Sequence, residues 1–280
     1  RRSVDEVLAD LDAMLRGHGR GLRTAFLQDA NPLLVPTDDL VAIIEGLRER
    51  FPKLERVTAY ARSRTLARKA TADLVRLRAA GLDRLHVGLE SASDAVLAMV
   101  RKGSTGAEQI QAGQKAKAAG FELSEYVMPG LGGVALSAEH ADETAKAIAA
   151  IEPDFVRLRQ GVFQPLGEMA LVAEIRRFLA GLEGARTRLE SDHILNLLME
   201  LKGDLPERLP EIIAICDEFL GLSEGERWRF VLARRMGWMG RLRDLQARRL
   251  PPGLERVWAE LETRGLSPEE AAAQLRAQMV

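Results

Sequence analysis

Five polar stretches, each directly after a short apolar run, carry most of the side chains here that can do chemistry. They are residues 28–32, 60–64, 90–91 and 126–133, and Arg159. The carboxyl ends of parallel strands meet at one edge of a sheet, and ligands bind outside that edge. If the five runs are parallel strands, their ends form one mouth that receives something small and charged.

Each stretch also has a purely structural interpretation. Residues 29–32 fit a turn that opens a helix, because Asx side chains bond nearby backbone N–H groups. Arg62 and Arg64 fit solvated loop cations, and residues 90–91 fit the cap of the next helix. We favour a functional role for Glu90, since a carboxylate seldom follows a strand as apolar as residues 85–89.

The sequence offers no metal ligands in a recognisable spacing. Its 4 histidines are scattered, with no HExxH or paired spacing, so we predict no metal site and assign no catalytic residue. Cys216 is the 1 cysteine and lies in an apolar helical run, which predicts a core thiol. A single cysteine excludes an internal disulfide, a CxxC pair and any cluster held by several thiolates of this chain.

The elements that must position the polar stretches alternate between strand-like and helical sequence. The apolar runs centre near residues 26, 57, 87, 126 and 156, about one βαβ unit apart. Helices are predicted between them at residues 37–50, 70–79, 93–100, 105–119 and 137–150, after an initial helix that opens with the capping box of Ser3 and Glu6. This order predicts an α/β fold with a parallel sheet, a partial barrel that begins without a first strand.

After residue 160 the sequence becomes mostly helical. Helices are predicted at residues 171–180, 194–201, 210–220, 224–235, 254–263 and 268–278. We therefore predict two parts, a barrel-like domain over residues 1–165 and a helical region over residues 166–280. Arg234 and Arg235 are expected on a solvated helix face.

The charge balance is almost even. Forty Lys and Arg against 41 Asp and Glu give a net charge of −1, which removes the simplest argument for nucleic-acid or anionic-membrane binding. A local basic patch leaves nucleic acid open as a partner. No apolar run approaches the roughly 20 residues of a membrane span, and no secretory signal opens the chain, so a cytoplasmic protein without membrane contact is predicted.

Four motifs together resemble the core of a radical S-adenosylmethionine (SAM) enzyme. They are Phe26-Leu27-Gln28-Asp29-Ala30-Asn31-Pro32, His86-Val87-Gly88-Leu89-Glu90-Ser91-Ala92-Ser93-Asp94, Met99-Val100-Arg101-Lys102-Gly103 and Glu125-Tyr126-Val127-Met128-Pro129-Gly130-Leu131-Gly132-Gly133. The resemblance covers roughly residues 1–160, and Gly88 to Ser91 followed by Arg101 to Gly103 is its most specific part. Residues 191–198 are similar to the segment after that core in uncharacterised bacterial members.

The resemblance implies a (β/α)6 partial TIM-like barrel and a 4Fe–4S cluster on a CxxxCxxC loop. SAM chelates the cluster, and an electron from a reductant cleaves SAM to a 5′-deoxyadenosyl radical that acts on an unknown substrate. Residues implied in cofactor binding lie at four strand ends and one helix end. They are Asp29, Asn31, Arg62, Glu90, Ser91 and Arg101 toward the methionine and ribose, and Glu125, Met128, Pro129 and Gly130 toward the ribose and adenine.

The first strand and the cysteine loop of the resembled family are not in this sequence. Cys216 cannot replace them, because one thiolate does not hold a four-iron cluster. The absence of an initiator Met favours a fragment, truncated upstream of Arg1, of a parent that binds SAM and the cluster. The chain alone is then expected to be inactive, with a degenerate homologue as the other possibility.

Two further functions stay open. One is a metal-independent barrel lyase or isomerase with Glu90 as base and Arg62 or Arg159 binding an anion, which needs a lysine or second acid at the mouth. The other is a non-catalytic module whose helical region recruits a protein partner or RNA.

Overall fold

The core of the molecule is one sheet of seven strands that lie in chain order. The computed structural model describes residues 2–28, 31–160, 166–246 and 251–279. Strands β1 to β6 are parallel, and β7 pairs with β6 in the antiparallel direction. The strands are β1 Thr24–Leu27, β2 Arg56–Ala61, β3 Arg84–Glu90, β4 Glu122–Val127, β5 Phe155–Leu158, β6 Thr187–Glu190 and β7 Gly203–Leu205.

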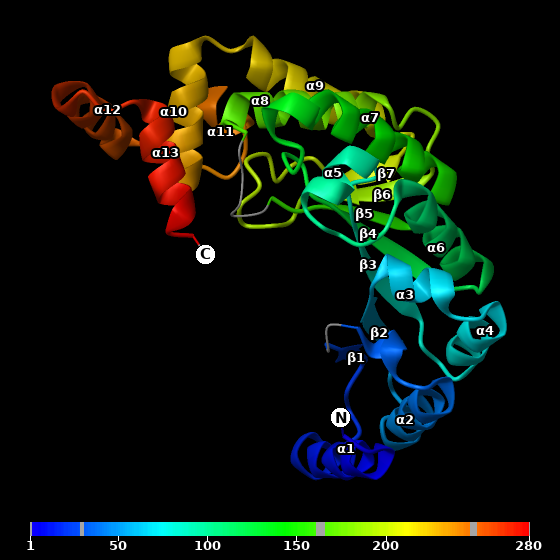
Figure 1. Cartoon of the computed structure of the whole chain (residues 1–280). Coiled ribbons are helices and arrows are strands. Elements are labelled where there is room, and N and C mark those ends of the chain that lie inside the picture. Colours follow the sequence, from blue (N-terminus) through cyan, green and yellow to red (C-terminus); the bar gives the residue numbers. More distant parts are fainter. Residues whose placement is uncertain (1, 29–30, 161–165, 247–250, 280) are drawn as a thin grey trace.

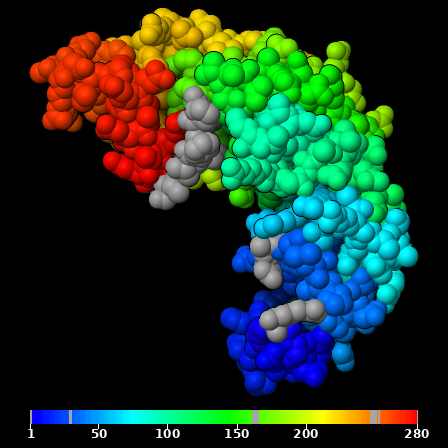
Figure 2. All heavy atoms as spheres, viewed as in Figure 1, coloured from blue at the N-terminus to red at the C-terminus, as the bar shows by residue number. Residues whose placement is uncertain are grey.

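Helices cover the outer side of the sheet and extend it at both ends, so that the molecule forms an open crescent (Figure 1). Figure 2 shows the same crescent hollowed on its inner side, with the N-terminal and C-terminal parts at its two tips. The helices are α1 Val4–His18, η1 Pro32–Leu34, α2 Thr37–Arg50, α3 Ser63–Arg68, α4 Thr71–Ala79, α5 Asp94–Met99, α6 Gly106–Ala118, α7 Gly133–Ile151, α8 Glu168–Ala180, α9 Leu209–Gly221, α10 Glu224–Arg235, α11 Arg243–Gln246, α12 Pro252–Arg264 and α13 Pro268–Ala277.

The two faces of the sheet differ in chemistry because residues alternate along each strand. In β3, Leu85, Val87 and Leu89 are buried against the helical layer, whereas Arg84, His86, Gly88 and Glu90 occupy the other face. The outer face is thus an ordinary apolar core. The inner face is polar, which is unusual for parallel strands, whose two faces are normally both apolar.

The architecture confirms the predicted α/β fold, a partial barrel followed by a mostly helical region. The sheet does not stop at residue 165, because β6 and β7 extend it across the predicted division between residues 1–165 and 166–280. That division stays a prediction. None of the helices in the described ranges is long and apolar enough to cross a membrane.

The helix predicted at residues 194–201 is wrong, since this segment is an irregular loop. Its apolar residues reach the core without helical structure, and Asn196 holds it across the end of β5. The Asn196 side chain donates to the Leu158 carbonyl at 2.8 Å and to Ser191 Oγ at 2.9 Å, and it accepts from the Gln160 N–H at 3.1 Å. A buried polar network has replaced helical hydrogen bonds here.

Arg234 and Arg235 do not lie on a solvated face, contrary to the expectation from the sequence. Only 6% and 4% of their surfaces are exposed. The Arg235 guanidinium donates to Glu168 Oε1 at 2.7 Å and to the Leu195 carbonyl at 2.6 Å. The two arginines join the helical region to the segment that follows β5, so their role is structural.

Candidate functional site

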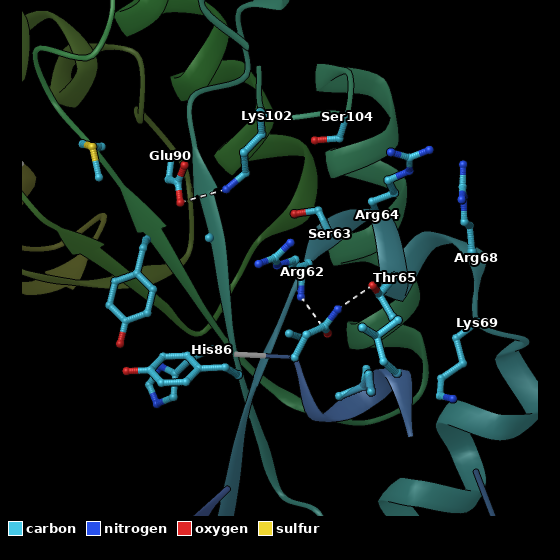
Figure 3. A pocket seen from close by; sticks show the side chains of 18 of the residues that line it. Arg62, Ser63, Arg64, Thr65, Arg68, Lys69, His86, Glu90, Lys102 and Ser104 are labelled. Atoms are coloured by element: carbon cyan, nitrogen blue, oxygen red, sulfur yellow. Dashed lines mark hydrogen bonds and ion pairs between the residues drawn. The ribbon is translucent and has the colours of Figure 1, made fainter. Parts of the chain in front are cut away.

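A cleft of about 950 Å3 opens at the carboxyl ends of the strands, as the parallel order requires. The ends of β1 to β5 each contribute a polar or polarisable group to it. The residues are Asn31, Arg62, Glu90, Met128 and Arg159. The loops and α3 supply the remaining wall, which includes Ser63, Arg64, Thr65, Arg68, Lys69, Lys102 and Ser104. Figure 3 shows this arrangement from close by.

Glu90 enters the cleft from a bulge at the end of β3. The register with β4 shifts between Gly88 and Glu90, and Glu90 itself has φ of 64°, a left-handed conformation that is uncommon for residues other than glycine. Its Oε1 lies 2.8 Å from Lys102 Nζ, the ion pair drawn in Figure 3. A Cβ at Gly88 would lie 2.8 Å from that same Oε1, so only glycine leaves the pair this position.

Asn31 is fixed on the opposite wall by two hydrogen bonds. Its Nδ2 donates to Thr65 Oγ1 at 2.7 Å, and its Oδ1 accepts from the Arg62 backbone N–H at 3.4 Å (Figure 3). This joins the segment after β1 to the start of α3. It also leaves the Arg62 guanidinium in the cleft with no carboxylate partner among the described residues.

The cleft is strongly cationic. Among the described lining residues, six cationic side chains accompany a single carboxylate, Glu90. The six are Arg62, Arg64, Arg68, Lys69, Lys102 and Arg159. Low-dielectric walls focus the field of such charges and raise the local concentration of anions. The cleft is therefore suited to a ligand with negative groups.

Aromatic rings and an arginine form a floor on the inner face of the sheet. Ring centroids are 6.1 Å apart for Tyr60 and His86 and 5.6 Å apart for His86 and Tyr126, the latter pair stacked. The Arg159 guanidinium lies over the Tyr126 ring at 4.5 Å, and Phe26 extends the row with a centroid 4.6 Å from Tyr60. Burial, with help from Arg157 and Arg84, lowers the pKa of His86 to about 4, so this ring is neutral at pH 7.

The structure places the other predicted site residues outside the cleft lining. Ser91 is fully buried, and its Oγ lies 2.8 Å from His140 Nδ1. Arg101 is exposed and does not line the cleft, whereas its neighbour Lys102 does. Asp29 lies outside the described residues. The role of each in binding SAM stays a prediction.

Glu125 lies behind the floor rather than in the cleft. It is 1% exposed, its carboxylate accepts the Leu89 N–H, and its Oε2 has no partner within the described chain. Burial raises its pKa well above the usual range, which favours the protonated form.

The loop after β4 is held from behind by two buried ionisable residues. Glu174 of α8 accepts from the Gly130 N–H and from Ser137 Oγ, both at 2.6 Å. His140 of α7 lies with Nε2 3.1 Å from the Met128 carbonyl. Pro129 contacts a small cavity beside the same two side chains. Gly130 and Pro129 thus form the support of the cleft, and Met128 forms its lining.

Sequence reasoning missed Lys102, Arg68 and Lys69 as cleft residues, and it left Arg64 open between a ligand contact at a strand end and a solvated loop cation. The alternative of a barrel lyase or isomerase requires a lysine or a second acid at the mouth, and Lys102 is such a lysine. The signal was present in the run of basic residues at 62, 64, 68 and 69, whose spacing places them on or beside one short helix.

No residues of this chain fit an iron–sulfur cluster. Cys216, the 1 cysteine, is fully buried in α9, and burial raises the pKa of its thiol to about 12. The described ranges contain no group of His, Cys, Asp and Glu side chains arranged for a metal ion. We therefore derive no reaction step through a cluster.

Comparison with solved structures gives distant similarities. Methylornithine synthase (PylB) is 16% identical, with 69% of this chain and 58% of that chain covered and a TM-score of 0.47. Elp3 from the archaeon Methanocaldococcus infernus is 16% identical, with 78% and 59% covered and a TM-score of 0.48. Coproporphyrinogen III oxidase (HemN) from Escherichia coli is 18% identical, with 62% and 40% covered and a TM-score of 0.47.

The chain thus spans less than two thirds of the length of these structures. No curated protein matches it. The model of the radical SAM superfamily matches residues 1–148, more than half of the 280 residues and all strands from β1 to β4. The chain belongs to the radical SAM superfamily.

Proposed function

We propose that the cleft binds SAM. Members of this superfamily use SAM together with a 4Fe–4S cluster. The observation that carries the proposal is the Glu90–Lys102 pair, which presents a carboxylate and an ammonium 2.8 Å apart at the strand ends. SAM carries an ammonium and a carboxylate on its methionine end and two hydroxyls on its ribose, so this pair offers a partner for groups of each kind.

The remaining contacts fit the same ligand. Asn31 and the backbone near Met128 supply neutral hydrogen-bonding groups on opposite sides of the cleft. A volume of about 950 Å3 is ample, since small-molecule sites span roughly 300–1,000 Å3. Binding and orienting SAM is therefore the role that we assign to these residues.

Cleavage of SAM to a radical is the activity that the cluster supplies in this superfamily. This chain has 1 cysteine, so we propose that the thiolates for a cluster come from outside these 280 residues. The proposal for the chain itself is limited to SAM binding, and it can be tested without iron.

Calorimetric titration of the purified chain with SAM tests the proposal. We expect saturable binding and a loss of about tenfold or more in affinity for Glu90→Gln and Lys102→Met, because each removes a charge-assisted hydrogen bond. Arg20→Met is the control, since it removes an exposed cation that does not line the cleft and has no predicted role in binding SAM.

Two results would count against the proposal. One is the absence of SAM binding by the unaltered chain. The other is equal weakening by Arg20→Met and Lys102→Met, which would show that overall charge and not the cleft sets the affinity.

A further inference from the structure

The charge of the cleft exceeds what SAM can use. SAM carries a sulfonium and an ammonium against one carboxylate, so it is itself a net cation. A site built for SAM alone gains nothing from six cationic side chains facing a single carboxylate. The surplus positive charge calls for a second, anionic ligand in the same cleft, an inference that rests on the proposed SAM site.

The surplus positive charge of the cleft is concentrated on and beside α3. Arg64 and Arg68 are four residues apart on a helix of 6 residues, with Lys69 next to them, and all three line the cleft. Like charges at this spacing repel and destabilise a helix. Neither arginine has a carboxylate partner among the described residues, and Lys69 Nζ only donates to Thr37 Oγ1 at 3.1 Å. Figure 3 shows the three side chains along one side of the cleft.

The other side of the cleft offers flat π surfaces. Tyr60, His86 and Tyr126 belong to adjacent strands and line the cleft, with Arg159 over the last ring. In Figure 3, Thr65 lies between His86 and the side chains of Arg68 and Lys69. A row of aromatic faces beside cations is the pattern that binds nucleobases by stacking and phosphates by charge.

We propose that the cleft binds a nucleotide unit beside SAM, its base on the Tyr60–His86–Tyr126 floor and its phosphate on Arg64, Arg68 and Lys69. The cleft volume of about 950 Å3 lies at the upper end of the roughly 300–1,000 Å3 found for ligand sites, which leaves room for a second molecule. The nucleotide is the substrate or the reacting part of it. It enters free or as one residue of an RNA strand, and both present the same chemistry.

Titration with uridine 5′-monophosphate (UMP) and with uridine tests the phosphate half of the site. UMP shares its ribose with SAM but lacks the adenine and the methionine, so the Glu90→Gln variant is needed to separate its contacts from those of SAM. We expect UMP to bind about tenfold or more tighter than uridine, and Arg64→Gln/Arg68→Gln to remove that difference. Arg16→Gln/Arg20→Gln removes the same charge from exposed positions outside the cleft and should leave the difference between UMP and uridine intact.

Tyr60→Leu and Tyr60→Phe test the floor. Leucine keeps the residue apolar but removes the ring, so we expect the UMP affinity to fall by about fivefold or more, whereas phenylalanine should restore it. A merely structural role of Tyr60 would weaken UMP and SAM together. Stacking predicts that SAM binding is unchanged by Tyr60→Leu and that UMP binding is unchanged by Glu90→Gln.

A single-stranded U10 RNA identifies the source of the nucleotide. If it binds tighter than UMP, with an affinity that falls steeply with NaCl, the ligand is part of an RNA strand; equal or weaker binding assigns a free nucleotide. Failure of SAM to bind would sink the proposed function and leave the UMP result standing. The nucleotide proposal is overturned if UMP does not bind, or if uridine binds equally well and the α3 variants change nothing.

Discussion

His140 and Glu174 are ionisable side chains that serve the cleft from behind it. Each side chain is 2% exposed, and His140 Nε2 lies 3.6 Å from Glu174 Oε1. Burial lowers the pKa of His140 to about 4, so this ring is neutral at pH 7, and burial raises the pKa of Glu174. As hydrogen-bonding groups they fix the Met128 carbonyl and the Gly130 N–H, and with them the loop that lines the cleft.

The lowered pKa of His140 predicts a loss of stability in weak acid. Its folded pKa of about 4 is below the ordinary 6.5, so the unfolded chain takes up the proton first as pH falls. The contribution of His140 to the free energy of unfolding is complete above pH 6.5. It falls by about 3 kcal/mol between pH 6.5 and about pH 4. Urea unfolding of the chain and of His140→Gln at several pH values measures it.

The difference in unfolding free energy between these two proteins isolates His140 from other groups. Glu174 has a raised pKa and contributes the opposite slope in both proteins. We expect the advantage of the unaltered chain over His140→Gln to shrink as pH falls from 6.5 to 4.5. A constant difference for His140→Gln would refute the assignment.

Residue types at strand ends could be predicted, but their exact orientation could not. The expectation that ligands bind beyond the carboxyl ends of parallel strands identified Asn31, Arg62, Glu90 and Met128, which all line the cleft. The resemblance to the radical SAM core named Arg101 rather than Lys102. Arg101 adopts φ of 53°, and this one left-handed residue decides which of two adjacent cations turns inward. No pattern of residue types specifies such a turn in advance.

At the scale of the element, β3 is the strand on which the site depends. The alternation of buried and less buried residues in β3 could be predicted from the sequence. Its bulge could not, because the same residues fit a regular strand and a bulged strand equally well. The strands β6 and β7 were missed for another reason. They are only 4 and 3 residues long, too short to show a period of two against the helical sequence around them.

Gly88→Ala is predicted to damage the site and spare the fold. The added Cβ would lie 2.8 Å from Glu90 Oε1 and 3.3 Å from Lys102 Nζ, both at the ends of flexible side chains. The pair can move aside at little cost to stability, but it then leaves its position in the cleft. We expect the melting temperature to change by less than about 4 °C, which corresponds to under ~1 kcal/mol, and SAM affinity to fall about tenfold.

Gly21→Ala is the control for this substitution, since its Cβ meets nothing within 4 Å. Calorimetry gives the SAM affinity, and thermal unfolding gives the melting temperature. Unchanged SAM binding by Gly88→Ala would show that the position of the Glu90–Lys102 pair does not matter to the ligand.

At the scale of the whole molecule, the crescent holds its polar inner face open because helices are confined to the outer side (Figure 1). The C-terminal helices are attached to this frame by contacts between residues far apart in sequence. Arg235 and Glu168 are 67 residues apart, and their side chains are 0% and 4% exposed. A local pattern cannot reveal such a pair, so the sequence placed Arg235 in solvent.

Breaking this buried pair should loosen the attachment of the helical region. Among the described residues, Arg235→Met leaves the buried Glu168 carboxylate with only Arg276, whose Nη1 is 3.5 Å away, as an ion-pair partner. Removing one member of a buried ion pair costs about 3–5 kcal/mol, whereas replacing both members by apolar residues is often neutral. We therefore expect Arg235→Met to lower the free energy of unfolding by that amount and Arg235→Met/Glu168→Leu to recover most of it.

Urea unfolding of the two variants measures both free energies. If the double variant is less stable than the single one, the two side chains act independently, and the ion pair does not hold the helical region to the sheet.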